Sequence, residues 1–207
     1  MTDYKTINNK SSVQLIEKRS KFIGYASPVI SEEEALDFIG KVKALHWDAK
    51  HNVYAYDIIE DGRQRYSDDS EPKGTAGLPI IEIIKKEGLK NIVVVVTRYF
   101  GGVLLGKGGL IRAYSSAAKM AIDAAQIVNM SLCKLYDLTT DYNFYAKVSS
   151  LIASNFGFID NTDFTDKVKV TFHIKDIYID SLMIKINDAT AGNFDIKVIK
   201  EVFLKTT

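Results

Sequence analysis

Hydrophobic and polar positions in the first half of the chain alternate in a way that predicts strands separated by helices. Residues 21–30 (KFIGYASPVI) and 51–59 (HNVYAYDII) are rich in aromatic and β-branched residues, which is typical of strands. Between them, residues 31–46 carry apolar side chains at helical spacing, and Ser31 with Glu34 forms a capping box that begins a helix.

A helix, a strand and a further helix are predicted after a polar loop at residues 60–77. Pro79 fits the first turn of a helix that Gly88 ends. The uninterrupted apolar run NIVVVVT at 91–97 predicts a strand buried on both faces. After a glycine-rich turn, a further helix is expected to bury one face, made of Leu110, Tyr114, Ala117, Ala121, Ile122 and Ala125.

The last third of the chain has a different order of elements. Residues 166–174 alternate strictly, with Val168, Val170, Phe172 and Ile174 on one side and Lys167, Lys169, Thr171 and His173 on the other. The predicted order is βαββαβ, which is the ferredoxin-like arrangement with two helices on one face of an antiparallel sheet. Its elements are expected at 131–140, 141–157 with Asp141 as N-cap, 156–160, 166–174, 176–192 and 194–205. We therefore predict an α+β protein with an N-terminal domain over 1–130 and a ferredoxin-like C-terminal domain over 131–207.

Charge and composition exclude several classes of function. The 207 residues include 27 Lys and Arg against 26 Asp and Glu, so any nucleic-acid contact must come from a local patch. The first residues lack an apolar signal core, and no apolar run approaches transmembrane length, which predicts a cytoplasmic protein without membrane contact. Cys133 is the single cysteine, and its place in an alternating segment indicates a packed thiol.

The turn after the apolar run carries a nearly complete phosphate-binding signature. Gly101 to Lys107 has the form G-x-x-x-x-G-K, but Gly108 stands where a P-loop needs a hydroxyl to hold magnesium. A nucleotide triphosphatase is therefore not expected. Glycines before a helix can expose backbone N–H groups to an anion, and Arg98, Lys107 and Arg112 add positive charge. In the alternative interpretation the glycines only permit a tight turn and the charges are solvated.

An acidic loop precedes the second predicted helix. Asp68, Asp69 and Glu71 could bind a divalent cation or act as acid and base, but their spacing lacks the pattern of a calcium loop. A turn-forming loop is favoured, and the three histidines offer no metal-ligand spacing, so no metal or cofactor is predicted. His51 opens a strand from which it reaches these carboxylates, either for a structural hydrogen bond or for catalysis.

Three motifs together resemble one family. HNVYAY at 51–56, DDSEPKGTAGLP at 68–79 and RYFGGVLLGKGGLIRAY at 98–114 are similar to the IMPACT/YigZ family. The resemblance implies an N-terminal domain like the second domain of a small-subunit ribosomal protein, a fold also found in elongation factor G and GHMP kinases. It implies a C-terminal domain like the ferredoxin-like C-terminal domains of elongation factor G. Eukaryotic relatives are translation regulators that bind the activator of a starvation-responsive kinase, whereas the resemblance implies no firm activity for bacterial members.

The leading hypothesis is a non-enzymatic, translation-associated binding protein whose partner is RNA, the ribosome or a translation factor. We expect the acidic loop to pack beside the glycine-rich turn, with Glu71 near Arg98. Two alternatives stay open: an enzyme that acts on a phosphorylated metabolite with Glu71 or His51 as acid or base, and a protein-interaction module. No catalytic residue, cofactor or oligomeric state is assigned. The predicted binding residues are His51, Asp68, Asp69, Glu71, Thr75, Arg98, Tyr99, Phe100, Gly101, Gly102, Lys107, Gly108, Gly109 and Arg112.

Overall fold

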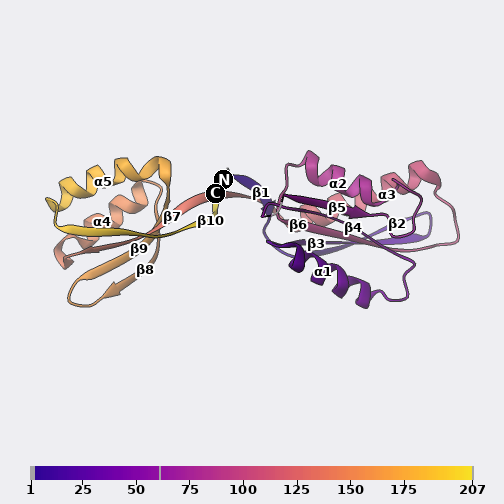
Figure 1. Ribbon diagram of the computed structural model, residues 1–207, viewed down its shortest axis with the longest axis horizontal. Helices are drawn as coiled ribbons and strands as arrows, with labels where there is room; N and C mark the ends of the chain where they lie inside the picture. The colour runs from indigo at the N-terminus through magenta and orange to yellow at the C-terminus, as the bar shows by residue number, and fades with distance from the viewer. Residues whose placement is uncertain (1–2, 61, 207) are drawn as a thin grey trace. The chain divides into compact units, whose positions relative to one another are not determined.

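The computed structural model, which describes residues 3–60 and 62–206, divides into two compact units (Figure 1). The N-terminal unit comprises Tyr4–Asn129, and the C-terminal unit comprises Met130–Thr206 together with Asp3. Each unit combines helices with an antiparallel sheet, which confirms the predicted α+β class. No helix in the described part of the chain is long and apolar enough to cross a membrane.

The N-terminal unit is built on a five-stranded sheet with β6 at its centre. The strand order is β2-β3-β6-β4-β5, and each neighbouring pair is antiparallel. All but the last residue of β6 are buried, as its uninterrupted apolar run predicts. The short strand β1 (Tyr4–Ile7) lies outside this sheet, whose strands are β2 (Ser11–Glu17), β3 (Ser20–Pro28), β4 (His51–Ile58), β5 (Arg63–Ser67) and β6 (Ile92–Tyr99).

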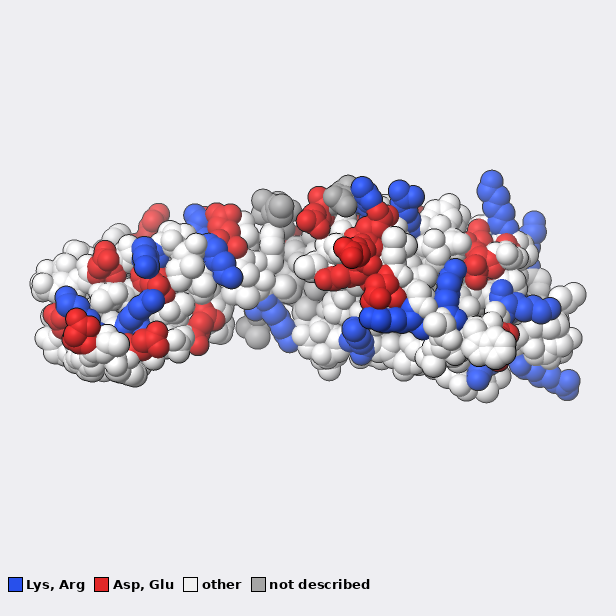
Figure 2. Space-filling model, turned by 60° about the horizontal axis from the view of Figure 1, so that its bottom comes forward, with Lys and Arg blue, Asp and Glu red and all other residues white. Residues whose placement is uncertain are grey.

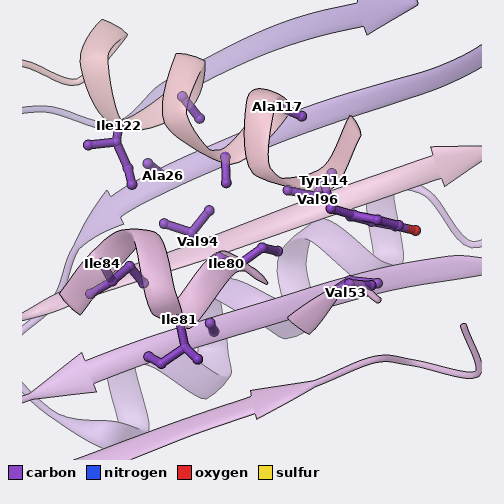
Figure 3. Close-up of a cluster of buried hydrophobic side chains, with 14 of the residues drawn as sticks. Ala26, Val53, Ile80, Ile81, Ile84, Val94, Val96, Tyr114, Ala117 and Ile122 are labelled. Carbon is purple, nitrogen blue, oxygen red and sulfur yellow. The ribbon is translucent and has the colours of Figure 1, made fainter. Parts of the chain in front are cut away.

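Helices cover both faces of this sheet. The helix α1 (Glu32–Leu45) packs on one face, and α2 (Gly77–Lys86) and α3 (Gly106–Ala124) pack on the other (Figure 1). One of the two hydrogen bonds of the predicted capping box is formed, because the Ser31 hydroxyl accepts from the Glu34 N–H at 3.2 Å. Figure 3 shows isoleucines of α2 and the apolar face of α3 meeting valines of the sheet. All six residues predicted for the apolar face of α3 are buried.

The C-terminal unit has the βαββαβ order that the alternation predicts. Its strands run in the order β10-β7-β9-β8, and α4 and α5 share one core with the sheet. Val168, Val170, Phe172 and Ile174 all face this core. Cys133 is 2% exposed, which confirms a packed thiol. The elements are β7 (Ile127–Thr140), α4 (Tyr142–Ser154), β8 (Phe158–Phe164), β9 (Val168–Lys175), α5 (Asp176–Thr190) and β10 (Phe194–Thr206).

The structure corrects the sequence-based elements at three places. The strands β1 and β2 were not predicted, and residues 60–77 are not all loop, because β5 forms within them. Four of the five side chains of β5 are exposed, so its polar residues carry no alternation from which a strand is recognised. Asp141 is the N-cap residue of α4 as expected, but its side chain makes no capping hydrogen bond.

Two glycines of the N-terminal unit give opposite predictions for substitution by alanine. A Cβ on Gly24 of β3 would lie 2.5 Å from the Ala117 carbonyl oxygen, whereas a Cβ on Gly40 of α1 would meet nothing within 4 Å. We expect Gly24→Ala to lower the free energy of unfolding by about 1 to 3 kcal/mol through overpacking. Gly40→Ala should raise it by about 0.5 to 1 kcal/mol, because alanine favours a helix interior over glycine. Urea titration of both variants checks this, and a shift of the same sign in both would contradict it.

Candidate functional site

The predicted site residues gather at one end of the N-terminal sheet, where β3 and β4 begin and β6 ends. The register pairs Lys21 with Tyr99 and His51 with Arg98, so the first residues of β3 and β4 flank the last residues of β6. The acidic loop (68–76), the glycine-rich turn (100–105) and the start of α3 meet this end. We call it the glycine-turn end.

A buried ion pair joins the acidic loop to β6. Arg98 Nη1 donates to Glu71 Oε1 at 2.6 Å, and the Tyr114 hydroxyl donates to the same oxygen at 2.7 Å. The Arg98 and Glu71 side chains are 7% and 3% exposed. Burial and the neighbouring carboxylate raise the pKa of Tyr114, so its hydroxyl stays a donor. The predicted packing of the loop beside the turn, with Glu71 near Arg98, is confirmed.

His51 lies at the edge of this pair. Its Nδ1 is 2.8 Å from the Asp69 carbonyl oxygen, which is an acceptor, so Nδ1 carries a proton and donates. Its Nε2 is 3.9 Å from Glu71 Oε1. The predicted reach of His51 to the loop is confirmed, and the bond to the Asp69 carbonyl is a structural one.

The carboxylates of the acidic loop hold the loop itself. The Asp68 carboxylate accepts from the backbone N–H groups of Gly74 at 2.8 Å, Ala76 at 3.1 Å and Gly77 at 2.8 Å. Asp69 Oδ2 accepts from the Asn52 N–H at 2.6 Å. The bonds from Ala76 and Gly77 satisfy donors at the start of α2, and the bond from Asn52 ties the loop to β4, which supports the turn-forming interpretation.

Other groups in the loop follow the same pattern. The buried Thr75 hydroxyl donates to the Pro72 carbonyl at 2.6 Å. Over residues 3–60 and 62–206, no three His, Cys, Asp or Glu side chains are grouped to hold a metal ion.

Arg98 does not occupy the surface position expected for a phosphate contact. It is 6% exposed, and its guanidinium lies 5.5 Å from the Phe22 ring centre and 5.6 Å from that of Phe100. Its charge is compensated by Glu71, and its buried Nε has no hydrogen-bond partner among the described residues. The cations that remain on the surface among the predicted residues are Lys107 and Arg112.

The glycine-rich turn combines tight packing with an open helix terminus. A Cβ on Gly101 would lie 2.0 Å from the Arg19 carbonyl carbon, and Gly102 has φ of +81°, so both positions require glycine. The tight-turn interpretation therefore holds for these two residues. The helix α3 begins at Gly106 without a side-chain cap and without an acidic residue in its first turn. Among residues 3–60 and 62–206 no side chain caps this first turn, so the N–H groups at the start of α3, where Lys107 and Gly108 are exposed, are available to an anion.

A small cavity lies between this helix start and the β2–β3 turn. It measures about 150 Å³ and is bordered by cations from both elements, Lys18 and Arg112, with Glu17 as the acidic neighbour. Gly109 lines it, and Gly108 lies close to the Arg112 guanidinium. The structure therefore groups Lys107, Gly108, Gly109 and Arg112 at the start of α3. The buried Glu71–Arg98 pair forms a separate group.

Sequence reasoning missed a second polar network at the same end. The Tyr25 hydroxyl lies 2.7 Å from His46 Nε2, and His46 Nδ1 lies 2.9 Å from the Tyr99 hydroxyl. The Tyr99 hydroxyl donates to Asp48 Oδ1 at 2.8 Å. Next to these residues, Trp47 is 84% exposed. Tyr25 and Tyr99 lie far in sequence from His46 and Asp48. The motif H-W-D after the first predicted helix was therefore the one local feature that could have indicated this network.

The His46 network predicts a loss of stability at acidic pH. Burial, opposed by Asp48 and reinforced by Lys21, lowers the pKa of His46 below its usual value. Because the pKa of His46 is lower in the folded state, the contribution of neutral His46 to stability is fully present above the unfolded pKa of about 6.5. It is lost as the pH falls through the folded pKa. The free energy of unfolding should therefore fall between about pH 7.5 and pH 5. His46→Gln should weaken this fall, and an identical pH profile for both proteins would contradict the prediction.

Comparison with known proteins places the chain in a family. A family model for the Impact N-terminal domain matches residues 18–122, and one for a domain of unknown function (DUF1949) matches residues 138–193. The IMPACT family member YvyE of Bacillus subtilis is 34% identical over 94% of this chain and 90% of its own length. The chain belongs to the IMPACT family. The resemblance carried by the three sequence motifs is thereby confirmed.

Other relatives of this IMPACT protein extend the comparison. The IMPACT family member YigZ of Escherichia coli is 30% identical over 89% of this chain and 92% of its own length. Protein IMPACT of Homo sapiens is 31% identical over 45% of this chain and 31% of its own length. A solved structure, described as a hypothetical protein, is 28% identical, covers 97% of this chain and 98% of its own, and has a TM-score of 0.61. The finer likenesses to ribosomal-protein, elongation-factor and GHMP-kinase domains stay predictions.

Proposed function

We propose that this IMPACT-family protein is a translation-associated binding protein that contacts RNA phosphate, the ribosome or a translation factor through its glycine-turn end. The presence of IMPACT proteins among its relatives supports a regulatory or translation-related role. The observation that carries the proposal is the set of uncompensated cations around the open start of α3.

These cations come from separate elements of the N-terminal unit. Lys18 and Arg19 form the β2–β3 turn, Lys50 precedes β4, and Lys107 and Arg112 lie on α3. All five are exposed, and none makes an ion pair within residues 3–60 and 62–206. Figure 2 shows basic side chains projecting at the right-hand end of the N-terminal unit, while the largest acidic group on this face lies farther to the left.

The acidic residues of the loop do not cancel this charge. Glu71 is committed to Arg98 and Tyr114, and Asp68 to backbone N–H groups. Glu17 and Asp48 are exposed nearby and leave an excess of positive charge. A local basic patch on a nearly neutral chain favours contact with phosphate.

The C-terminal sheet lacks such an excess on its open face. Asp137 accepts from Lys169 at 2.9 Å and from Thr171 at 2.7 Å, and lies 4.0 Å from Lys197. Burial opposes ionisation, but these hydrogen bonds and charges hold the pKa of Asp137 below its usual value. Lys169 and Lys197 of this face therefore lie close to a carboxylate that offsets their charge, which makes it a poor phosphate surface.

The proposal predicts a salt-dependent affinity for RNA that depends on α3. In titrations of the full chain with RNA at several salt concentrations, Lys107→Ala and Arg112→Ala should each weaken binding and lower the log–log salt slope by about 1. Lys169→Ala is the control, since its charge is already paired with Asp137. A slope that stays unchanged in both α3 variants, or falls equally in the control, would contradict the assignment.

A second candidate function is an enzyme that acts on a phosphorylated metabolite at the same end. The specific observation in its favour is that a backbone carbonyl orients His51 with Nε2 toward Glu71. A screen of phosphorylated metabolites by thermal shift distinguishes the two, because a small-molecule substrate raises the melting temperature in a saturable way. Loss of that shift in His51→Ala, without any salt-dependent RNA binding, would favour the enzyme.

A further inference from the structure

Two aromatic rings stand exposed at the glycine-turn end. Trp47, the single tryptophan of the sequence, is 84% exposed, and Phe100 is 50% exposed. Large aromatic side chains in binding proteins are concentrated where a partner covers them. Because these two rings lie within a basic surface, the partner must offer both negative charge and flat apolar groups.

The segments that carry these rings are tied to each other. Trp47 stands between His46 and Asp48 in the chain, and both of these residues bond to the Tyr99 hydroxyl, at 2.9 Å and 2.8 Å. Phe100 follows Tyr99 directly. The backbone positions of the two rings are thus fixed relative to one another by hydrogen bonds.

Cations lie beside two aromatic rings of this end, those of Tyr99 and Phe100, and another cation follows Trp47 in the sequence. Lys50 is exposed three positions after Trp47 in the sequence. The Lys21 ammonium lies 4.9 Å from the centre of the Tyr99 ring, and the Arg98 guanidinium lies 5.6 Å from that of Phe100. The chemistry of this end is therefore alternating aromatic and cationic, which matches alternating bases and phosphates.

We propose that the glycine-turn end binds single-stranded RNA, with Trp47 and Phe100 stacking on unpaired bases while Lys50, Lys107 and Arg112 contact phosphates. This inference rests on the proposed function and names the form of RNA. In a duplex the bases are stacked on one another, so an exposed ring finds no free base face. In a single strand every base presents a π-face, and stacking is tolerant of sequence.

The test uses the full chain and RNA probes of about 12 nucleotides, one single-stranded and one an RNA duplex of the same sequence. We expect the single strand to bind more tightly, and Trp47→Ala to weaken its binding by about 5- to 100-fold. Trp47→Phe should keep most of the affinity, because a ring remains. Trp47 fluorescence in the unaltered protein should change on addition of the single strand.

Controls separate stacking from folding and from charge. Leu36→Ala removes a side chain that is 51% exposed and lies near the start of α1, whereas Trp47 lies after the end of that helix. It should leave RNA affinity unchanged. Trp47→Ala should also leave the salt slope and the melting temperature unchanged, since it removes neither a phosphate contact nor a buried group.

The outcomes distinguish this inference from the function on which it rests. Equal binding of both probes, with no effect of Trp47→Ala but a loss in Lys107→Ala, would overturn base stacking and leave phosphate contact standing. If the fluorescence emission of Trp47 did not change on addition of RNA but changed on addition of a purified translation factor, the ring would be assigned to a protein partner. That result would also overturn the base-stacking proposal. Absence of RNA binding at low salt would remove RNA contact altogether.

Discussion

Replacing Glu71 by alanine is expected to lower the free energy of unfolding of the N-terminal unit by about 3 to 5 kcal/mol. The substitution leaves the Arg98 guanidinium buried without its counter-charge, because that side chain is 7% exposed. It also removes the acceptor of the Tyr114 hydroxyl, which is itself fully buried. Urea titration followed by circular dichroism measures the change.

An exposed ion pair of the same unit provides the matched control. Glu82 lies 3.4 Å from Lys85 on α2, with side chains 60% and 45% exposed. Glu82→Ala should lower the free energy of unfolding by at most about 0.5 kcal/mol, because solvent screens the pair and ordering two exposed side chains costs entropy. Similar losses in Glu71→Ala and Glu82→Ala would mean that the burial of Glu71 contributes nothing to stability.

The second large effect is expected in the other unit. Phe172→Ala should destabilise the C-terminal unit by about 3 to 5 kcal/mol, since the ring is fully buried and its removal leaves a cavity. The core around Phe172 shares no residue with the two cores of the N-terminal unit. The loss of stability should therefore be confined to the C-terminal unit. As a result, unfolding of the whole chain should depart from a two-state transition.

Hydrogen exchange resolved by segment is the measurement for this variant. Amides of β7 and β9 should exchange faster in Phe172→Ala, while those of β6 keep their protection. Phe158→Ala serves as the comparison, because that ring is 54% exposed on β8 and leaves no cavity. Equal acceleration in β6 and β9 would show that the units unfold together.

Elements with a strong hydrophobic pattern were predictable from sequence. The apolar run of β6, the one-sided face of α3 and the strict alternation of β9 each match a single kind of structure. The edge strands β2 and β5 were not predictable. Their pairing is decided by neighbouring strands, since β2 pairs with β3 and β5 pairs with β4 through exposed residues.

The candidate site was predictable in its charges but not in its burial. The opposite charges of the acidic loop and of the end of β6 were enough to predict that Glu71 and Arg98 lie near each other. That Arg98 lies between Phe22 and Phe100 depends on tertiary packing, which no local pattern reports. His46 was not selected because its partners, Tyr25 and Tyr99, lie on other elements. Trp47 was not selected because no local pattern shows that its ring is 84% exposed.

The burial of Cys133 makes its thiol a built-in probe of local unfolding. Burial raises the pKa of this thiol, and it is the single cysteine of the sequence, placed in β7 of the C-terminal unit. A thiol-specific reagent in solution therefore reacts only during the moments when that unit opens. The rate at which Cys133 is labelled, measured by mass spectrometry, therefore reports how often the C-terminal unit opens in the unaltered protein. No probe has to be introduced, and the N-terminal unit gives no signal.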